Sequence, residues 1–252
     1  MKFNELYKKL SELYPEALRC EWDNDGIMCA HSLDSEVKRV LISLDVTMDT
    51  VNYAIENGYD TIISHHPLVF RSQRSLTPLS FTQKKLIELI KGRVNVMSFH
   101  TRLDSANGGV NDVLAKKLGL SSIVVDSQDA IGRIGLLEKE MTLEGFARQV
   151  KESLSSPVVL FTGNKTVRKV YVVGGDGKDL IENAINAGCD TIVTGRGSYN
   201  TSVDACDMGI NIVEAGHFYT EHPVCYAVKE TVEELIPNAE ALVYFSNKIN
   251  II

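Results

Sequence analysis

Apolar residues recur along the chain with two alternating periods. Positions spaced three or four residues apart predict amphipathic helices at 2–13, 48–57, 82–91, 110–118 and 142–154. Short runs rich in valine and isoleucine predict strands between them, at 38–44, 60–64 and 94–99. Because helical and strand periods alternate rather than occupying separate parts of the chain, the pattern predicts an α/β fold.

A segment of this pattern occurs twice. Residues 38–64 (KRVLISLDVTMDTVNYAIENGYDTIIS) align without gaps on residues 168–194 (RKVYVVGGDGKDLIENAINAGCDTIVT), at an offset of 130 residues. Both copies read strand, helix, glycine, strand, which is the order of a βαβ unit. We therefore expect an internal duplication with mixed sheets, in two halves at 1–125 and 126–252 that are intertwined around one site. The alternative is chance similarity between two βαβ units.

Residues that can bind metal ions follow the predicted strands. They are His65 and His66 in the first copy of the repeat, His100 and Asp104 after the next strand, and His217 and Glu221 late in the chain. The second copy has Gly195 and Arg196 where the first has its two histidines, so the βαβ unit does not need histidines to fold. Since the carboxyl ends of strands converge at one edge of a sheet, these side chains are candidates for a common site.

Imidazole and carboxylate donors without thiolates suit zinc, iron, manganese or nickel. Two adjacent histidines on an extended backbone should point to opposite sides, so we expect His65 and His66 to serve two ions. Two such metals can activate water for hydrolysis. One alternative is that the histidines are merely hydrogen-bonded. Another is the DHH phosphoesterase motif, which requires an aspartate where Ser64 stands.

Composition narrows the class of protein. The chain has 252 residues, of which 44% are hydrophobic and 23% charged, as is typical of a globular protein. Its net charge of −7 disfavours binding to nucleic acid or to an anionic membrane. Its five cysteines form no C-x-x-C pair, so we expect neither a disulfide framework nor a thiolate zinc site. With no signal peptide pattern and no long apolar run, we expect a cytoplasmic location.

Motifs over nearly the whole chain resemble the NIF-three-like family of dinuclear-metal proteins, homologues of a type 2 GTP cyclohydrolase I. They include EWDNDGI (21–27), SHHPL (64–68), HTRLD (100–104), DTIVTG (190–195) and GHFYTE (216–221). The resemblance implies two related α/β halves without the middle domain that some members insert. It also implies a toroidal homohexamer with metal sites facing its interior, and a purine nucleotide such as GTP as substrate.

The resemblance also implies roles for particular residues. Two divalent metal ions would be held by His65, His66, Asp104, His217 and Glu221. His100 would lie beside them as a supporting group or as a catalytic proton carrier, whereas the role of His222 stays open.

Three positions depart from the family pattern. Arg102 stands where asparagine is common, Arg196 where an acidic residue is common, and Asn200 where histidine is common. The two arginines predict substrate binding through an anionic group such as phosphate, because a guanidinium matches phosphate oxygens. The alternative is that both face solvent or a subunit interface.

Three further features allow two interpretations each. The glycine-rich run 174–177 is either a phosphate loop or, as we favour, a tight strand-to-helix turn. Trp22 is either a core anchor, the default for a large aromatic, or a wall of the metal cavity. Asp45 either orients a histidine or caps the following helix.

These observations predict a dinuclear metal-dependent hydrolase that uses a metal-activated water, with His100 as general acid or base. The alternative is a metal storage, delivery or regulatory protein without turnover, which would need the same ligands.

Overall fold

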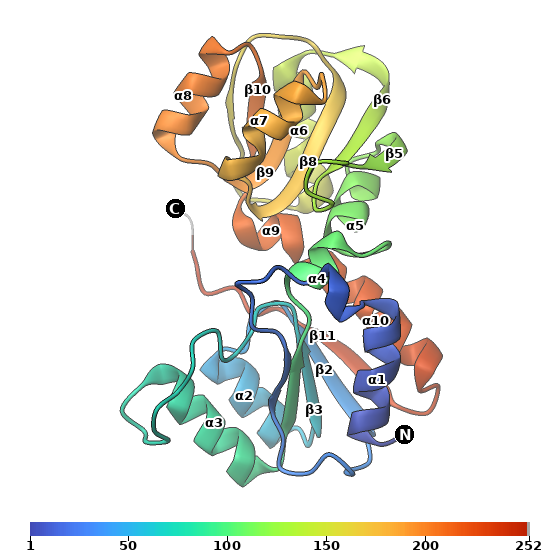
Figure 1. Cartoon of the computed structure of the whole chain (residues 1–252), viewed down its shortest axis with the longest axis vertical. Helices are drawn as coiled ribbons and strands as arrows, with labels where there is room; N and C mark the ends of the chain where they lie inside the picture. The colour runs from blue at the N-terminus through green and yellow to red at the C-terminus, as the bar shows by residue number, and fades with distance from the viewer. Residues whose placement is uncertain (251–252) are drawn as a thin grey trace. The chain divides into compact units, whose positions relative to one another are not determined.

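The computed structural model describes residues 1–250, which form two compact units (Figure 1). The first unit consists of residues 1–106 and 225–248, and the second of residues 107–224 together with 249–250. This division differs from the expected boundary after residue 125, because residues 121–125 pair with residues 133–136 of the second unit and the last strand of the chain pairs in parallel with a strand of the first unit. No helix within residues 1–250 has the length and apolarity to cross a membrane.

The first unit contains a five-stranded mixed sheet in the order β1-β4-β3-β2-β11. Its strands are β1 (Gly26–Cys29), β2 (Arg39–Ser43), β3 (Thr61–Ser64), β4 (Asn95–Ser98) and β11 (Glu240–Tyr244). Its helices are α1 (Phe3–Leu13), η1 (Glu16–Leu18), α2 (Met48–Glu56), α3 (Phe81–Gly92), α4 (Thr101–Ser105) and α10 (Val224–Leu235). Only β1 runs antiparallel to its neighbour, β4.

Helices cover both faces of this sheet, with α2 and α3 on one side and α1 and α10 on the other (Figure 1). Leu41, Ile62 and Val96, from three adjacent strands, pack with the residues of α2 and α3. The adjacent strand residues Ile63 and Met97 are buried as well. Strands buried on both faces explain why the sequence shows continuous apolar runs here rather than alternation.

The second unit contains a six-stranded mixed sheet in the order β5-β6-β8-β9-β10-β7. Its strands are β5 (Ser121–Val125), β6 (Arg133–Met141), β7 (Leu160–Thr162), β8 (Val167–Asp176), β9 (Thr191–Arg196) and β10 (Asn211–Glu214). Its helices are α5 (Val110–Lys117), α6 (Leu143–Leu154), η2 (Lys178–Leu180), α7 (Ile181–Asn186), α8 (Tyr199–Asp207) and α9 (His217–Glu221). Val193 packs with α5 and α6, whereas Ile192 packs with α7 and α8, so this sheet too is buried on both faces.

The structure confirms the predicted α/β class and the predicted elements, whose ends differ from the sequence-based bounds by one residue at most. The two units repeat the same four-strand arrangement, with β1-β4-β3-β2 corresponding to β7-β10-β9-β8. In each unit three strands run parallel and the preceding strand pairs antiparallel with the third. Thr61 pairs with Val40 and Asn95, and Thr191 pairs with Val170 and Asn211, so the register is also repeated.

The residues shared by the two copies make the same hydrogen bonds. Asp60 Oδ2 accepts from the main-chain amides of Lys38 and Arg39, at 2.8 and 2.9 Å, and Thr61 Oγ1 donates to Asp60 Oδ1. Asp190 does the same with the amides of residues 168 and 169 and with the Thr191 hydroxyl. The aspartate therefore ties the start of the first parallel strand to the start of the second, which explains why the G-x-D-T-I segment is repeated.

We expect Asp60→Ala and Asp190→Ala each to lower the free energy of unfolding by about 1–3 kcal/mol, because main-chain amides lose their acceptor. Urea unfolding followed by circular dichroism measures the effect. Asp34→Ala is the matched control, since Asp34 is 82% exposed and pairs only with Lys2 at the surface. Equal stability of all three variants would contradict a structural role for the repeated aspartates.

Candidate functional site

The two adjacent histidines of the first unit lie where the chain leaves β3. Strand β3 ends at Ser64 and the chain bends, while the amides of His65 and His66 donate to the carbonyls of residues 43 and 44, which continue β2. The two imidazole centroids are 5.0 Å apart. The expectation that the rings point to opposite sides is therefore wrong, because the backbone is no longer extended at these residues.

Ser64 has a structural role. Its hydroxyl lies 2.7 Å from the Ser98 hydroxyl of β4 and donates to the carbonyl of His66 at 2.9 Å. It thereby fixes the bend that orients the second histidine. A DHH-type site would need a metal-binding carboxylate at this position, so that alternative loses its first ligand.

The His65 ring is oriented by the main chain. Its Nδ1 lies 3.0 Å from the carbonyl oxygen of Phe99, just after β4. A carbonyl only accepts, so Nδ1 carries the hydrogen and donates it, which leaves the lone pair of the neutral ring on Nε2. That Nε2 lies 3.6 Å from Oδ1 of Asp104 on α4.

The His66 ring is oriented by a carboxylate. Its Nδ1 lies 2.8 Å from Oδ1 of Asp45, which follows β2. The cap of the following helix α2 is Thr47, whose hydroxyl accepts from the amide of Thr50. Of the two interpretations of Asp45, the structure therefore supports the orienting carboxylate.

His100 is fixed by two aspartates of the segment before β1. Asp23 Oδ1 lies 2.8 Å from His100 Nδ1, and Asp25 Oδ2 accepts from the His100 amide at 3.0 Å. Asp23 also accepts from the Thr101 amide and hydroxyl. Burial raises the pKa of Asp23, but hydrogen bonds from His100 and Thr101 outweigh burial and lower that pKa to about 2. Asp23 is therefore a carboxylate at neutral pH.

All three histidines are thus held through Nδ1. Ring nitrogens of His65, His66 and His100 lie within 4.8 Å of one another, close enough to bind one metal ion. Neutral imidazoles whose Nδ1–H groups are held by carboxylates or carbonyls are typical metal ligands, because the second partner fixes the tautomer and the orientation of the ring. This donor set fits zinc, iron, manganese or nickel. The sequence placed His100 beside the metal ligands, and in the structure it lies next to His65 and His66.

The role of Asp23 was not predicted from the sequence. The available signal was the pair of aspartates in EWDNDGI, immediately before a strand that pairs antiparallel with β4 and therefore begins near His100. Aspartates before a strand are typical of a turn, so their contact with His100 cannot be predicted unless the strand pairing is known.

Arg102 is fully buried, contrary to its predicted contact with substrate. Its Nε donates to Asp25 Oδ2 at 2.8 Å, another nitrogen donates to the Tyr14 carbonyl, and its guanidinium lies over the Phe99 ring. These partners occupy the guanidinium inside the first unit. Arg102 thus braces α4 and its neighbouring Asp25, which in turn holds the His100 amide.

Trp22 is not a core anchor, because 65% of it is exposed. Its ring centroid lies 6.2 Å from the His100 ring and 6.2 Å from the Phe70 ring, both in edge-to-face orientation. Trp22 and Phe70 therefore form an aromatic wall beside His100.

In the second unit, α9 carries the remaining predicted ligands. His217 and Glu221 lie one helical turn apart, and His217 Nε2 is 2.9 Å from Glu221 Oε2. Glycines let this helix approach the sheet closely. A methyl group at Gly175, whose φ is +68°, would lie 2.2 Å from Glu221 Oε1, and one at Gly195 would lie 2.7 Å from the Cα of His217.

The glycine-rich run 174–177 is a packing turn. The amides of Gly174, Gly175 and Gly177 donate to the side chains of Asn111, Thr220 and Thr194. Amides already engaged in this way cannot cradle a phosphate, which supports the turn interpretation.

His222 is stacked on Phe218, with ring centroids 4.6 Å apart. Burial lowers the pKa of His222 to about 4, so the ring is neutral at pH 7.

Arg196 is exposed at the end of β9 and lines a cavity of the second unit.

Comparison with known proteins identifies relatives over nearly the full length. Residues 1–250 match the family described as Duf34/NIF3 (NGG1p interacting factor 3). A protein of Clostridium perfringens named GTP cyclohydrolase 1 type 2 homolog is 35% identical over 242 residues, covering 93% of this chain and 92% of that protein.

Solved structures agree with this match. A hypothetical protein of Staphylococcus aureus superimposes with a TM-score of 0.93 at 28% identity, covering 100% of this chain and 99% of that one. HcgD of Methanocaldococcus jannaschii in its reduced form superimposes with a TM-score of 0.85 at 26% identity, covering 96% and 97%.

We expect Asp45→Asn to weaken metal binding about 10–100-fold, because the His66 ring loses its charged partner. Competition between the protein and a colorimetric chelator for zinc measures the affinity. Asp49→Asn is the matched control, because Asp49 lies in the first turn of α2 and pairs with Lys248 at the surface. Unchanged affinity in both variants would show that Asp45 does not support a metal ligand.

Proposed function

We propose, given that the chain belongs to the Duf34/NIF3 family, that it is a hydrolase dependent on two divalent metal ions. The observation that carries this proposal is the group of three histidines in the first unit, each held through Nδ1 and with ring nitrogens within 4.8 Å of one another. Three imidazoles oriented by hydrogen bonds are more than the fold requires, because the second unit builds the same four strands without them.

The proposed ligands are His65, His66 and Asp104 from the first unit and His217 and Glu221 from the second. Each set alone offers few donors, whereas together they provide three imidazoles and two carboxylates, which suits two ions of zinc, iron, manganese or nickel. The close approach of His65 to Asp104 and of His217 to Glu221 supports this proposal, because each pair combines a nitrogen with an oxygen donor.

Divalent ions bound there would lower the pKa of water and polarise the substrate. The chain itself contributes orientation and proton transfer. Asp23 holds the Nδ1–H of His100, so that the Nε2 of this ring can take up or release a proton. We propose His100 as the general acid or base of the reaction, oriented by Asp23.

We propose a purine nucleotide as the substrate class. The relatives' name, GTP cyclohydrolase 1 type 2 homolog, is one support. The other is the exposed aromatic wall of Trp22 and Phe70 beside His100, because planar bases stack on aromatic side chains. The homohexamer implied by the resemblance stays a prediction, which light scattering of the purified chain would test.

We expect about two transition-metal ions per chain in protein purified without added metal, and fewer in Glu221→Ala. Elemental analysis of both proteins measures this. The control is His31→Ala, which removes the histidine outside the predicted strand ends and should leave the metal content unchanged. Wild-type protein that holds no metal and takes up none of zinc, iron or manganese on titration would overturn the proposed centre.

We expect His100→Asn to retain the metal while nucleotide hydrolysis falls about 100- to 10,000-fold, because the variant lacks an acid or base. Release of product from GTP and other purine nucleotides measures turnover, and elemental analysis measures the metal. Loss of metal in this variant would make His100 a ligand rather than a proton carrier. Metal-loaded wild type without turnover on any nucleotide would favour the storage or delivery function.

A further inference from the structure

A cavity of about 420 Å³ lies in the second unit, at the carboxyl ends of the adjacent parallel strands β8 and β9. It is lined by Asp176, Lys178, Arg196, Gly197, Ser198 and Tyr199. Open α/β sheets bind their ligands at this end of the strands. None of the proposed metal ligands lines the cavity, so its chemistry depends on other side chains.

The charge of the cavity is dominated by Arg196. Lys178 Nζ lies 3.3 Å from Asp176 Oδ2, so these two charges largely offset each other. Although the strand register pairs Asp176 with Arg196, the Arg196 guanidinium makes no hydrogen bond or ion pair with any residue among 1–250. An arginine without a counter-charge presents a planar fork of donors, which matches the oxygens of a phosphate.

The walls of the cavity are held by hydrogen bonds. Glu214, at the end of β10, accepts from the Gly197 amide at 2.8 Å and from the Ser202 hydroxyl at 3.1 Å. Ser198 caps the nine-residue helix α8 by accepting from the Thr201 amide. The loop beside Arg196 is therefore ordered before any ligand arrives, which reduces the entropy lost on binding.

Two residues that line the cavity each directly follow a glycine that contacts α9. Asp176 follows Gly175, where an added methyl group would meet Glu221 Oε1 at 2.2 Å. Arg196 follows Gly195, where it would meet the Cα of His217 at 2.7 Å. A ligand held in the cavity is thus next to the helix that carries two proposed metal ligands.

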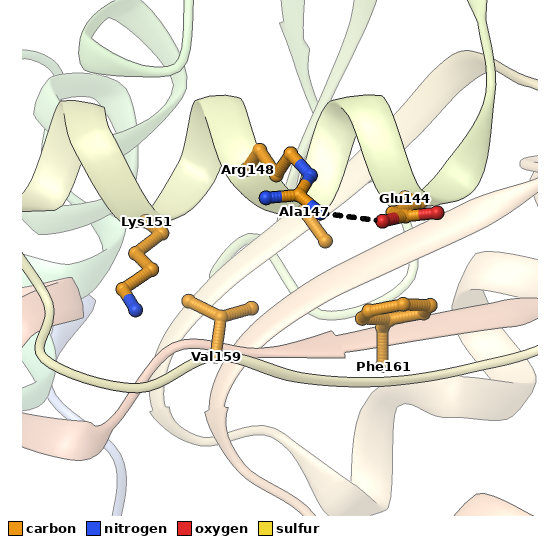
Figure 2. Close-up of a pocket in the computed structure, with 6 residues that line it drawn as sticks. All are labelled: Glu144, Ala147, Arg148, Lys151, Val159 and Phe161. Carbon is orange, nitrogen blue, oxygen red and sulfur yellow. Dashed lines mark hydrogen bonds and ion pairs between the residues drawn. The ribbon is translucent and has the colours of Figure 1, made fainter.

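A second cavity of the same unit provides a contrast. Its volume is about 190 Å³, and it lies between α6 and the segment that includes β7. Figure 2 shows Arg148 reaching Glu144 across one turn of α6, at 2.6 Å, with Val159 and Phe161 on the facing segment. Because this arginine is already paired with Glu144, whereas Arg196 is not paired with any residue among 1–250, Arg148 supplies a control for the loss of one arginine.

We infer that the cavity lined by Arg196 binds the phosphate group of the substrate, which makes that substrate a small phosphorylated molecule. This inference rests on the proposed function, because the metal ligands on α9 give the neighbouring cavity its role. The first turn of α8, which begins after Ser198, adds the positive end of a helix to the charge of Arg196. Tyr199, 83% exposed, offers an aromatic face to the part of the molecule that carries the phosphate.

The test is calorimetric titration of inorganic phosphate into the full chain, as purified, at low ionic strength. We expect Arg196→Gln to weaken binding at least about tenfold, since the charge-assisted pair is lost. Arg196→Lys should bind with intermediate affinity, and Arg148→Gln, the matched control, should bind like wild type. Absence of binding by wild type, or equal binding by Arg196→Gln and Arg148→Gln, would overturn the inference.

Metal content measured on the same samples separates the two proposals. If phosphate binding survives Arg196→Gln but disappears on chelation, the metal ions bind the phosphate, so the inference fails and the metal centre stands. If the protein holds no metal yet binds phosphate through Arg196, the anion site stands and the proposed hydrolase fails.

Discussion

The candidate site depends on one property of imidazole: a neutral ring offers a metal-binding lone pair on one nitrogen only, and the partner of the other nitrogen decides which. In the first unit that partner is the Phe99 carbonyl for His65, Asp45 for His66 and Asp23 for His100. Each partner follows or precedes a different strand of one sheet. The order of strands in the sheet therefore sets the tautomers of the site, and the chemistry is inseparable from the fold.

The buried pair of Asp25 and Arg102 completes this arrangement. Asp25 Oδ2 accepts from both the His100 amide and Arg102 Nε, so the same oxygen ties α4 to the segment before β1. Removing one partner of such a pair typically costs about 3–5 kcal/mol, because the other charge stays buried. Arg102 thus helps to position His100 in the candidate site, through the carboxylate that they share.

The sequence was sufficient to predict the α/β class, the duplication and about half of the helices and strands, because period and β-branched runs are local properties. It failed where distant partners decide. The return of β11 to β2 depends on a pairing across about 200 residues, and the burial of Arg102 depends on an aspartate 77 positions earlier. The common orientation of His65 and His66 depends on a bend that the hydroxyl of Ser64 fixes by bonding to the residue two positions later. Periodicity carries none of this information.

The duplication shows how two copies of one framework can acquire complementary charge. Asp60 and Asp190 hold the starts of the strands in the same way, so the strand ends are free to differ. The first copy ends in two histidines and the second in Gly195 and Arg196. A carboxylate such as Glu221 attracts metal ions but repels a phosphate. Arg196, which makes no ion pair among residues 1–250, lies one residue from the strand position on which the helix of Glu221 rests, so the phosphate that we propose would meet a positive charge beside that carboxylate. Gly195 allows α9 to pack directly beside Arg196, because any larger residue at position 195 would displace α9.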